Sequence, residues 1–190
     1  MRGLTLACIA GCLMVAGPSF AGKYEPTALP QIGGVAPAFG LEAFRAKGED
    51  DSGREVIQLD HYCGVRPGET SMVLLAFVNN ESASDDLGPL VQWHRRYNRD
   101  GLVVIAISTE KDPTPMGELV AKSRRSFPIV DDQFGIVSQR YGISGAPFTL
   151  LLDDQCSVLG MSDKAVSEDS ARLQSAIDER VKSIRIAARK

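Results

Sequence analysis

The stretch Tyr141-Gly142-Ile143-Ser144-Gly145-Ala146-Pro147-Phe148-Thr149-Leu150 joins two apolar segments in the second half of this 190-residue chain. Before it, Phe134, Val137 and Tyr141 lie at helical spacing, and Gly142 closes that segment. After it, residues 148–152 form an apolar run of strand length, and residues 156–161 return across the polar turn 153–155. The stretch therefore predicts a junction between a short helix and a β-hairpin.

Two uninterrupted apolar runs, residues 72–78 and 102–107, precede this junction and are typical of strands buried on both faces. Between them, helical spacing predicts a helix that ends before Gly101, with its apolar face formed by Leu87, Leu90, Val91, His94 and Tyr97. Trp93 falls on another face of that helix and is expected to be partly exposed. The other predicted elements are short strands at 38–41, 56–59 and 127–130, a surface turn at 47–54, a helix at 115–126, and a last helix with the apolar stripe Leu173, Ile177, Val181 and Ile184. The order β-α-β-α-β-β-α predicts a mixed α/β domain.

Composition and charge narrow the range of functions. The chain is 44% hydrophobic and 24% charged, with a formal net charge of -3, which suits one folded domain with a substantial core. A mildly acidic chain cannot neutralise a run of phosphates, so no nucleic-acid partner is expected. The two histidines, His61 and His94, are too few and too far apart for a histidine-rich metal site, and the sequence predicts no cofactor.

The first 21 residues have the three parts of a secretory signal peptide: Arg2, the apolar residues 4–15, and the ending Ser19-Phe20-Ala21. The apolar run is shorter than the roughly 20 residues of a membrane-spanning helix. We therefore predict a signal peptide at 1–21, an irregular lead-in at 22–34, one domain at 35–190, and export to the periplasm or the exterior. The alternative is a lipoprotein anchored at Cys12, because Ile9-Ala10-Gly11-Cys12 matches a lipoprotein cleavage box.

Several of these segments together carry a family resemblance. Four segments carry it, in this order: Ala36-Pro37-Ala38-Phe39, the strands at 73–77 and 105–108, and residues 141–150. Together they resemble the thioredoxin fold of the exported redoxins, meaning TlpA-like proteins and the AhpC/TSA type. The resemblance covers roughly residues 35–162. It implies a central mixed sheet flanked by helices with an N-terminal β-hairpin extension. It also implies that Pro147 is preceded by a cis peptide bond and presents backbone to a bound peptide beside the redox site.

The chain departs from the redoxins where they carry their active cysteine. Residues 79–86, Asn79-Asn80-Glu81-Ser82-Ala83-Ser84-Asp85-Asp86, hold no cysteine, and the chain has no CxxC motif. A serine hydroxyl without an adjacent base stays protonated and forms no disulfide. Ser82 and Asp85 instead resemble a capping box, and Asp85 and Asp86 are expected as solvated carboxylates that suit the helix dipole.

This departure favours a non-catalytic binding or accessory module with a protein or peptide partner, no catalytic residue and no metal site. The acidic residues of this segment fit no calcium-loop spacing. The predicted binding groove consists of Glu81, Ser82, Ser84, Asp85, Ala146 and Pro147. The oligomeric state stays open.

Two cysteines, Cys63 and Cys156, remain once the signal peptide is removed. The resemblance implies that the start of the first central strand and the end of the strand after Pro147 meet away from the redox site. Cys63 and Cys156 lie near those points, so a structural disulfide is one expectation, and two unpaired buried cysteines are the other. The alternative function is a thiol-disulfide oxidoreductase or antioxidant peroxidase that uses this pair.

Overall fold

The computed structural model describes residues 28–44, 55–63, 70–112, 115–116 and 127–187. The signal segment 1–21, the predicted turn at 47–54 and most of the predicted helix at 115–126 lie outside these residues. The described elements are β1 (Gly40–Glu42), β2 (Val56–Gln58), the 3-10 helix η1 (Leu59–His61), β3 (Met72–Val78), α1 (Ala83–Tyr97), η2 (Asn98–Asp100), β4 (Leu102–Ser108), β5 (Ile129–Asp131), α3 (Ile136–Arg140), β6 (Phe148–Asp153), β7 (Val158–Ser162) and α4 (Ser170–Ala187).

The central sheet has five strands in the order β5-β4-β3-β6-β7. The pairs β3–β4 and β4–β5 are parallel, whereas β6 runs antiparallel to both β3 and β7. Strands β1 and β2 pair antiparallel in a small separate sheet. The mixed sheet, the flanking helices and the N-terminal hairpin are therefore those expected from the sequence.

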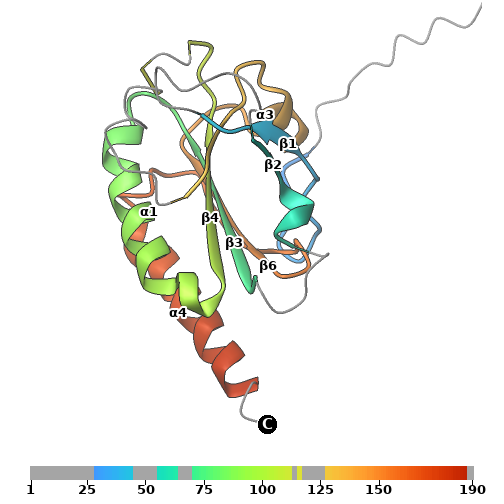
Figure 1. Cartoon of the computed structure of the whole chain (residues 1–190), viewed down its shortest axis with the longest axis vertical. Helices are drawn as coiled ribbons and strands as arrows, with labels where there is room; N and C mark the ends of the chain where they lie inside the picture. Colours follow the sequence, from blue (N-terminus) through green and yellow to red (C-terminus); the bar gives the residue numbers. More distant parts are fainter. Residues whose placement is uncertain (1–27, 45–54, 64–69, 113–114, 117–126, 188–190) are drawn as a thin grey trace, which may run out of the picture.

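Both faces of β3 are buried, which explains why its sequence is apolar at every position. Met72, Leu74, Ala76 and Val78 face one core layer, which α1 and α4 cover, while Val73, Leu75 and Phe77 face the other. Figure 1 shows α1 and α4 together on one side of the sheet, and α3 with the β1–β2 hairpin on the opposite side. Because side chains alternate along a strand, a strand with both faces buried needs apolar residues throughout.

Two sequence predictions about aromatic residues are wrong. Trp93 is only 3% exposed, and its indole Nε1 donates a 3.0 Å hydrogen bond to Gln174 on α4. The helix that buries Trp93 lies about 80 residues further along the chain, so the spacing within α1 could not reveal it. Phe134 is 79% exposed, because α3 begins only at Ile136 and Phe134 precedes the helical face.

Both outer strands of the central sheet have a neighbour from the N-terminal part of the domain. Residues 28–34 lack regular structure, as predicted, but the amide of Gly33 donates to the Val158 carbonyl and the amide of Ala36 donates to the Cys156 carbonyl. Along the opposite edge, Ala43 bridges to Val130, the middle residue of β5. Further along β7, the Arg172 guanidinium donates to the carbonyl of Met161.

Candidate functional site

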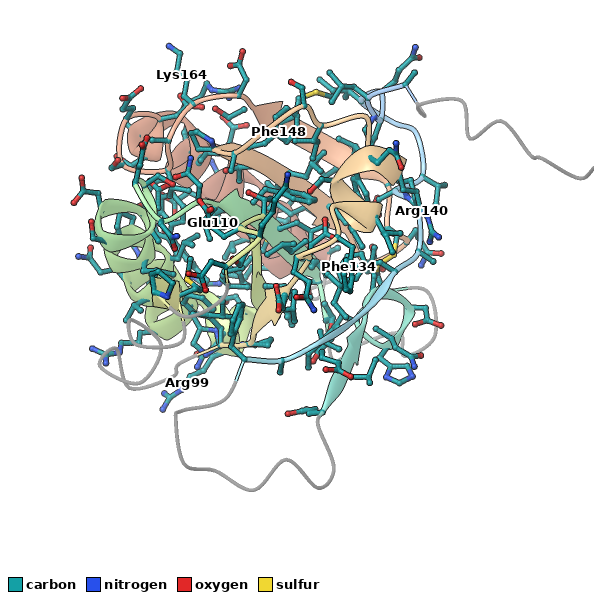
Figure 2. All side chains as sticks on the ribbon, turned by 90° about the horizontal axis from the view of Figure 1, so that it is seen from above. Arg99, Glu110, Phe134, Arg140, Phe148 and Lys164 are labelled. Atoms are coloured by element: carbon teal, nitrogen blue, oxygen red, sulfur yellow. A yellow bond between two sulfur atoms is a disulfide. The ribbon has the colours of Figure 1, made fainter. Side chains whose placement is uncertain are left out.

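The ends of β3 and β4 and the start of β6 lie at the same end of the sheet. Val78 pairs with Ser108, and Phe77 pairs with Phe148. The loop from Asn79 into α1 and the loop 142–147 therefore meet here. We call this the groove end; it is the upper end in Figure 1 and faces the viewer in Figure 2.

Asn79 connects these two loops. Its side-chain Oδ1 accepts a 2.8 Å hydrogen bond from the Ser82 amide, and its Nδ2 donates to the Ala146 carbonyl at 3.2 Å. One side chain thus caps the start of α1 and holds the loop that leads into β6. The neighbouring Asn80 amide donates to Glu110 Oε1 at 3.0 Å, so the loop after β4 is tied to the same point. Figure 2 shows Glu110 near the centre of this end.

The capping box predicted from Ser82 and Asp85 is absent. Ser82 already has helical backbone angles, and its side chain makes no capping hydrogen bond. Its Oγ is buried without a hydrogen-bond partner in the described part of the chain. Asp85 is exposed, and its carboxylate accepts only a 3.4 Å hydrogen bond from Ser84. Asn79 supplies the cap instead, so the sequence pattern indicated the right helix start with the wrong capping residue.

Asp86 is fully buried rather than solvated. Its Oδ1 accepts hydrogen bonds from the Ser167 amide at 3.1 Å and from the Ser167 hydroxyl at 3.3 Å. Its Oδ2 is buried and, among the described residues, has no hydrogen-bond partner. The expectation of a solvent-facing helix-start carboxylate holds for Asp85 and is wrong for Asp86. The reason is the segment before α4, which covers this side of α1's first turn.

The loop before β6 has the geometry that the resemblance implied. The Ala146–Pro147 peptide bond is cis, and Gly142 has a φ of 64°, a conformation that favours glycine. Tyr141, at the start of the loop, is fully buried, and its hydroxyl donates a 2.6 Å hydrogen bond to the Pro37 carbonyl. Burial raises the pKa of the Tyr141 hydroxyl, so it stays a hydrogen-bond donor at any physiological pH. The loop is therefore anchored to the lead-in as well as to Asn79.

Two adjoining hollows run along this loop. One, of about 420 Å³, is lined by Leu29, residues 142–148 and Asp163. The other, of about 460 Å³, is lined by Ala28, Leu29, Thr109, Gly135, Ser138, Gln139 and residues 142–145. Because they share Leu29 and residues 142–145, we describe them together as the groove. Their sizes fall within the usual range for ligand sites.

The groove coincides only in part with the residues named from sequence. Ala146 and Pro147 line it, whereas Glu81, Ser82, Ser84 and Asp85 do not and lie beside it, connected through the Asn79–Ala146 hydrogen bond. Sequence reasoning missed Leu29, Thr109 and Asp163, which come from three separate segments. A further hollow of about 330 Å³, between β1 and α3, lies away from the cis-proline loop.

The cysteine pair lies at the opposite end of the sheet. Cys63 and Cys156 form a disulfide with a Cα–Cα distance of 5.4 Å. Cys156 is in the turn after β6, and Asp153 at the end of β6 pairs with Met72 at the start of β3. Seven strand residues, at about 3.3 Å each, place the start of β3 about 20 Å from the groove end. Cys63 is only 3% exposed.

Among the residues that the structure describes, no group of three or more histidine, cysteine, aspartate or glutamate side chains could hold a metal ion. In the same part of the chain, none of the helices combines the length and apolar character needed to cross a membrane.

No protein-family model matches the chain, and a search of curated proteins found no match. Solved structures do match. A Chlorobium tepidum protein assigned as the thiol:disulfide interchange protein DsbE has a TM-score of 0.65 at 21% identity, over 80% of this chain and 99% of that chain.

Two further matches are the thioredoxin domain of a Bacteroides vulgatus thiol-disulfide oxidoreductase and a Plasmodium vivax 2-Cys peroxiredoxin. The first has a TM-score of 0.57 at 16% identity and covers 75% of this chain and 96% of that one. The second has a TM-score of 0.60 at 15% identity and covers 80% of this chain and 83% of that one. At these identities the likeness concerns the fold, and the described part of the chain has the thioredoxin fold.

Proposed function

We propose that this chain is an exported thioredoxin-fold protein that does not exchange thiols and disulfides and instead binds an extended peptide or protein segment in the groove. The observation that carries the proposal is the separation of cysteines from the groove. Residues 79–86 hold no cysteine, and the Cys63–Cys156 disulfide lies about 20 Å away at the other end of β3.

Among the described residues, the groove end places no histidine beside Ser82 or Ser84. Ser82 and Ser84 would need a nearby base to act as nucleophiles. Of the two histidines in the sequence, His94 lies twelve residues further along α1, about 18 Å from Ser82, and His61 belongs to η1 beside Cys63. Covalent catalysis through these serines is therefore disfavoured.

Features of the groove that suit binding are its shape and its support. It is lined by backbone and by apolar side chains such as Leu29 and Ile143. Its walls are held by Asn79, Tyr141 and Glu110 through hydrogen bonds to neighbouring loops. A surface fixed in this way loses little conformational freedom when a segment binds, which favours affinity.

The competing proposal is a thiol-disulfide oxidoreductase or peroxidase that uses Cys63 and Cys156. The presence of the disulfide favours it, because the pair could cycle between a bond and two thiols. The burial of Cys63 counts against it, since exchange needs an accessible sulfur. Reduction of insulin or turnover of hydrogen peroxide that disappears in Cys63→Ala would establish this alternative.

Export is supported by the signal-like residues 1–21 and by the disulfide, which persists in oxidising compartments. A chain cleaved after Ala21 begins at Gly22, and the mass of the cell-exported protein reports that end directly. A diacylglyceryl-modified Cys12 at the N-terminus would replace this proposal by a lipid-anchored protein.

A pair of glycine variants tests binding in the groove. Gly145 lines the groove, and a Cβ added there meets open space; the same is true of Gly160 on β7, outside the groove. Nonapeptides selected from a random library against the full chain are titrated by calorimetry. Gly145→Trp should weaken their binding at least tenfold, whereas Gly160→Trp should leave it unchanged. Failure to select any peptide, or equal binding by both variants, would contradict the proposal.

A further inference from the structure

The groove is lined mainly by backbone and apolar side chains, so it offers few charged groups to tell one bound segment from another. Its lining includes Leu29, Ile143, Ala146, Pro147 and Phe148, and Leu29 is 45% exposed. Any selectivity among peptides must therefore come from groups at its rim, where a bound segment passes on its way in and out.

That rim is acidic. Asp163 lines the groove itself. Glu81 is exposed just before α1, and Asp85 is exposed on the first turn of α1. None of these three carboxylates forms an ion pair within 4 Å of another described residue. Asp163 nevertheless interacts electrostatically with Arg172, whose pKa is raised first by its hydrogen bond to Asp169 and also by Asp163. Glu110 lies near the centre of the same end. Together these four residues make up what we call the acidic rim.

Nearby cations offset the acidic rim only in part. Lys111 is exposed directly after Glu110. Arg172 donates hydrogen bonds to the carboxylate of Asp169 through both Nε and Nη2. The hydrogen bonds from Arg172 and then from Ser162 lower the pKa of Asp169, and the charge of Lys164 lowers it further. Figure 2 shows Lys164 pointing outward at the periphery of this end. Counted over the described residues, the acidic rim therefore keeps an excess of negative charge around the groove.

We infer that the groove selects extended segments that carry lysine or arginine next to apolar residues. This inference rests on the proposed binding function and adds the chemistry of the partner. A carboxylate about 8 Å from a bound cation in water changes affinity about twofold, so three carboxylates together give about tenfold. Complementary charge of this kind also raises the association rate.

The test uses three fluorescein-labelled nonapeptides with one apolar scaffold and two variable positions, filled with lysine, glutamine or glutamate. Fluorescence anisotropy with the full chain gives their dissociation constants at 50 and 300 mM NaCl. We expect the lysine peptide to bind about tenfold more tightly than the glutamine peptide at low salt. The preference should fall to about twofold at high salt, because the screening length shortens from about 14 Å to about 6 Å.

The matched variants are Glu81→Gln/Asp85→Asn/Asp163→Asn and, as a control, Glu179→Gln on the exposed face of α4. The triple variant keeps Glu110, so its preference for lysine should fall to about twofold or less, while its affinity for the glutamine peptide stays within twofold of the wild type. The control should behave as the wild type. Equal binding of lysine and glutamine peptides to the wild type would overturn the inference but leave the proposed function standing. No binding of any peptide would overturn both.

Discussion

Removing the Cys63–Cys156 disulfide should destabilise the protein by about 4–5 kcal/mol. The two residues are 93 positions apart, so the bond closes about half of the chain into a loop. In the chain-entropy treatment a loop of that length lowers the entropy of the unfolded ensemble enough to stabilise the native state by about 4.6 kcal/mol at 25 °C. For a domain of this size that corresponds to a fall in Tm of about 9–18 °C.

The perturbation is made in two ways, because the cysteines also contribute packing. The wild-type protein in reductant keeps both sulfurs in place and loses only the covalent bond, whereas Cys63→Ala/Cys156→Ala also removes the sulfur atoms from the core. Urea unfolding is followed by circular dichroism and by the fluorescence of Trp93, the only tryptophan, which is buried between α1 and α4. Coincident transitions from the two probes justify a two-state treatment.

Closure of the loop by the disulfide also affects the m-value, the slope with which urea lowers the free energy of unfolding. An unfolded chain without the cross-link exposes more surface, so the m-value should rise together with the fall in stability. Reduced wild type that loses less than about 1 kcal/mol with an unchanged m-value would refute the reasoning. A large loss confined to the alanine variant would show that packing around Cys63, rather than loop closure, supplies the stability.

Three other predictions concern the groove end and α1. Glu81→Cys/Ser84→Cys places two exposed thiols three residues apart at a helix start, where thiol pKa values fall, and should create insulin-reducing activity. Ser82→Cys/Asp85→Cys, whose first thiol replaces a buried hydroxyl, should not. Inactivity of both pairs would contradict the proposed correspondence between residues 79–86 and the segment that carries the active cysteine in redoxins. Asp86→Ala leaves the Ser167 amide and hydroxyl without their acceptor and should lower the free energy of unfolding by about 1–3 kcal/mol in urea titrations. Asp85→Ala, on the exposed face of the same turn, should change it by less than about 0.5 kcal/mol. Burial lowers the pKa of His94, so the unfolded state binds more protons and stability is lost as the pH falls below about 6.5. The urea midpoints at pH 8 and pH 5.5 should therefore differ less in His94→Leu than in the wild type. An identical pH dependence in the two proteins would exclude His94 as the cause.

The strands were predictable because their sequence pattern is nearly independent of context. Residues 72–78 are apolar at every position, and a run of this length is typical of a strand covered on both faces. The cis bond at Pro147 was implied by the resemblance to the thioredoxin fold. The Cys63–Cys156 disulfide was one of two expectations, because that fold brings the two strand ends together but does not decide whether the cysteines bond. These features depend on topology rather than on individual side-chain contacts.

Two of the wrong predictions concern contacts between distant segments. Trp93 is buried by α4, and Asp86 is buried by the segment around Ser167, both about 80 residues away. The groove likewise combines Leu29, Thr109 and Asp163, which share no sequence pattern. Local spacing identified the start of α1, but it could not show which of its side chains a later part of the chain would cover.

The N-terminal neighbours of β7 and β5 have a consequence for self-association. An open strand edge offers unpaired amides and carbonyls on which a second molecule can add a strand, and this is a common route to aggregation. Here residues 33–36 lie along the β7 edge of the sheet, and residues 43–44 lie along the β5 edge. Arg172 donates a hydrogen bond to the Met161 carbonyl of β7, which accepts no hydrogen bond from residues 33–36. Residues 33–36 and 43–44 thus leave fewer unpaired backbone groups on the two edges for a second molecule to pair with. Proteolytic trimming of the chain up to residue 44 would uncover both edges of the central sheet at once and should favour self-association through strand pairing.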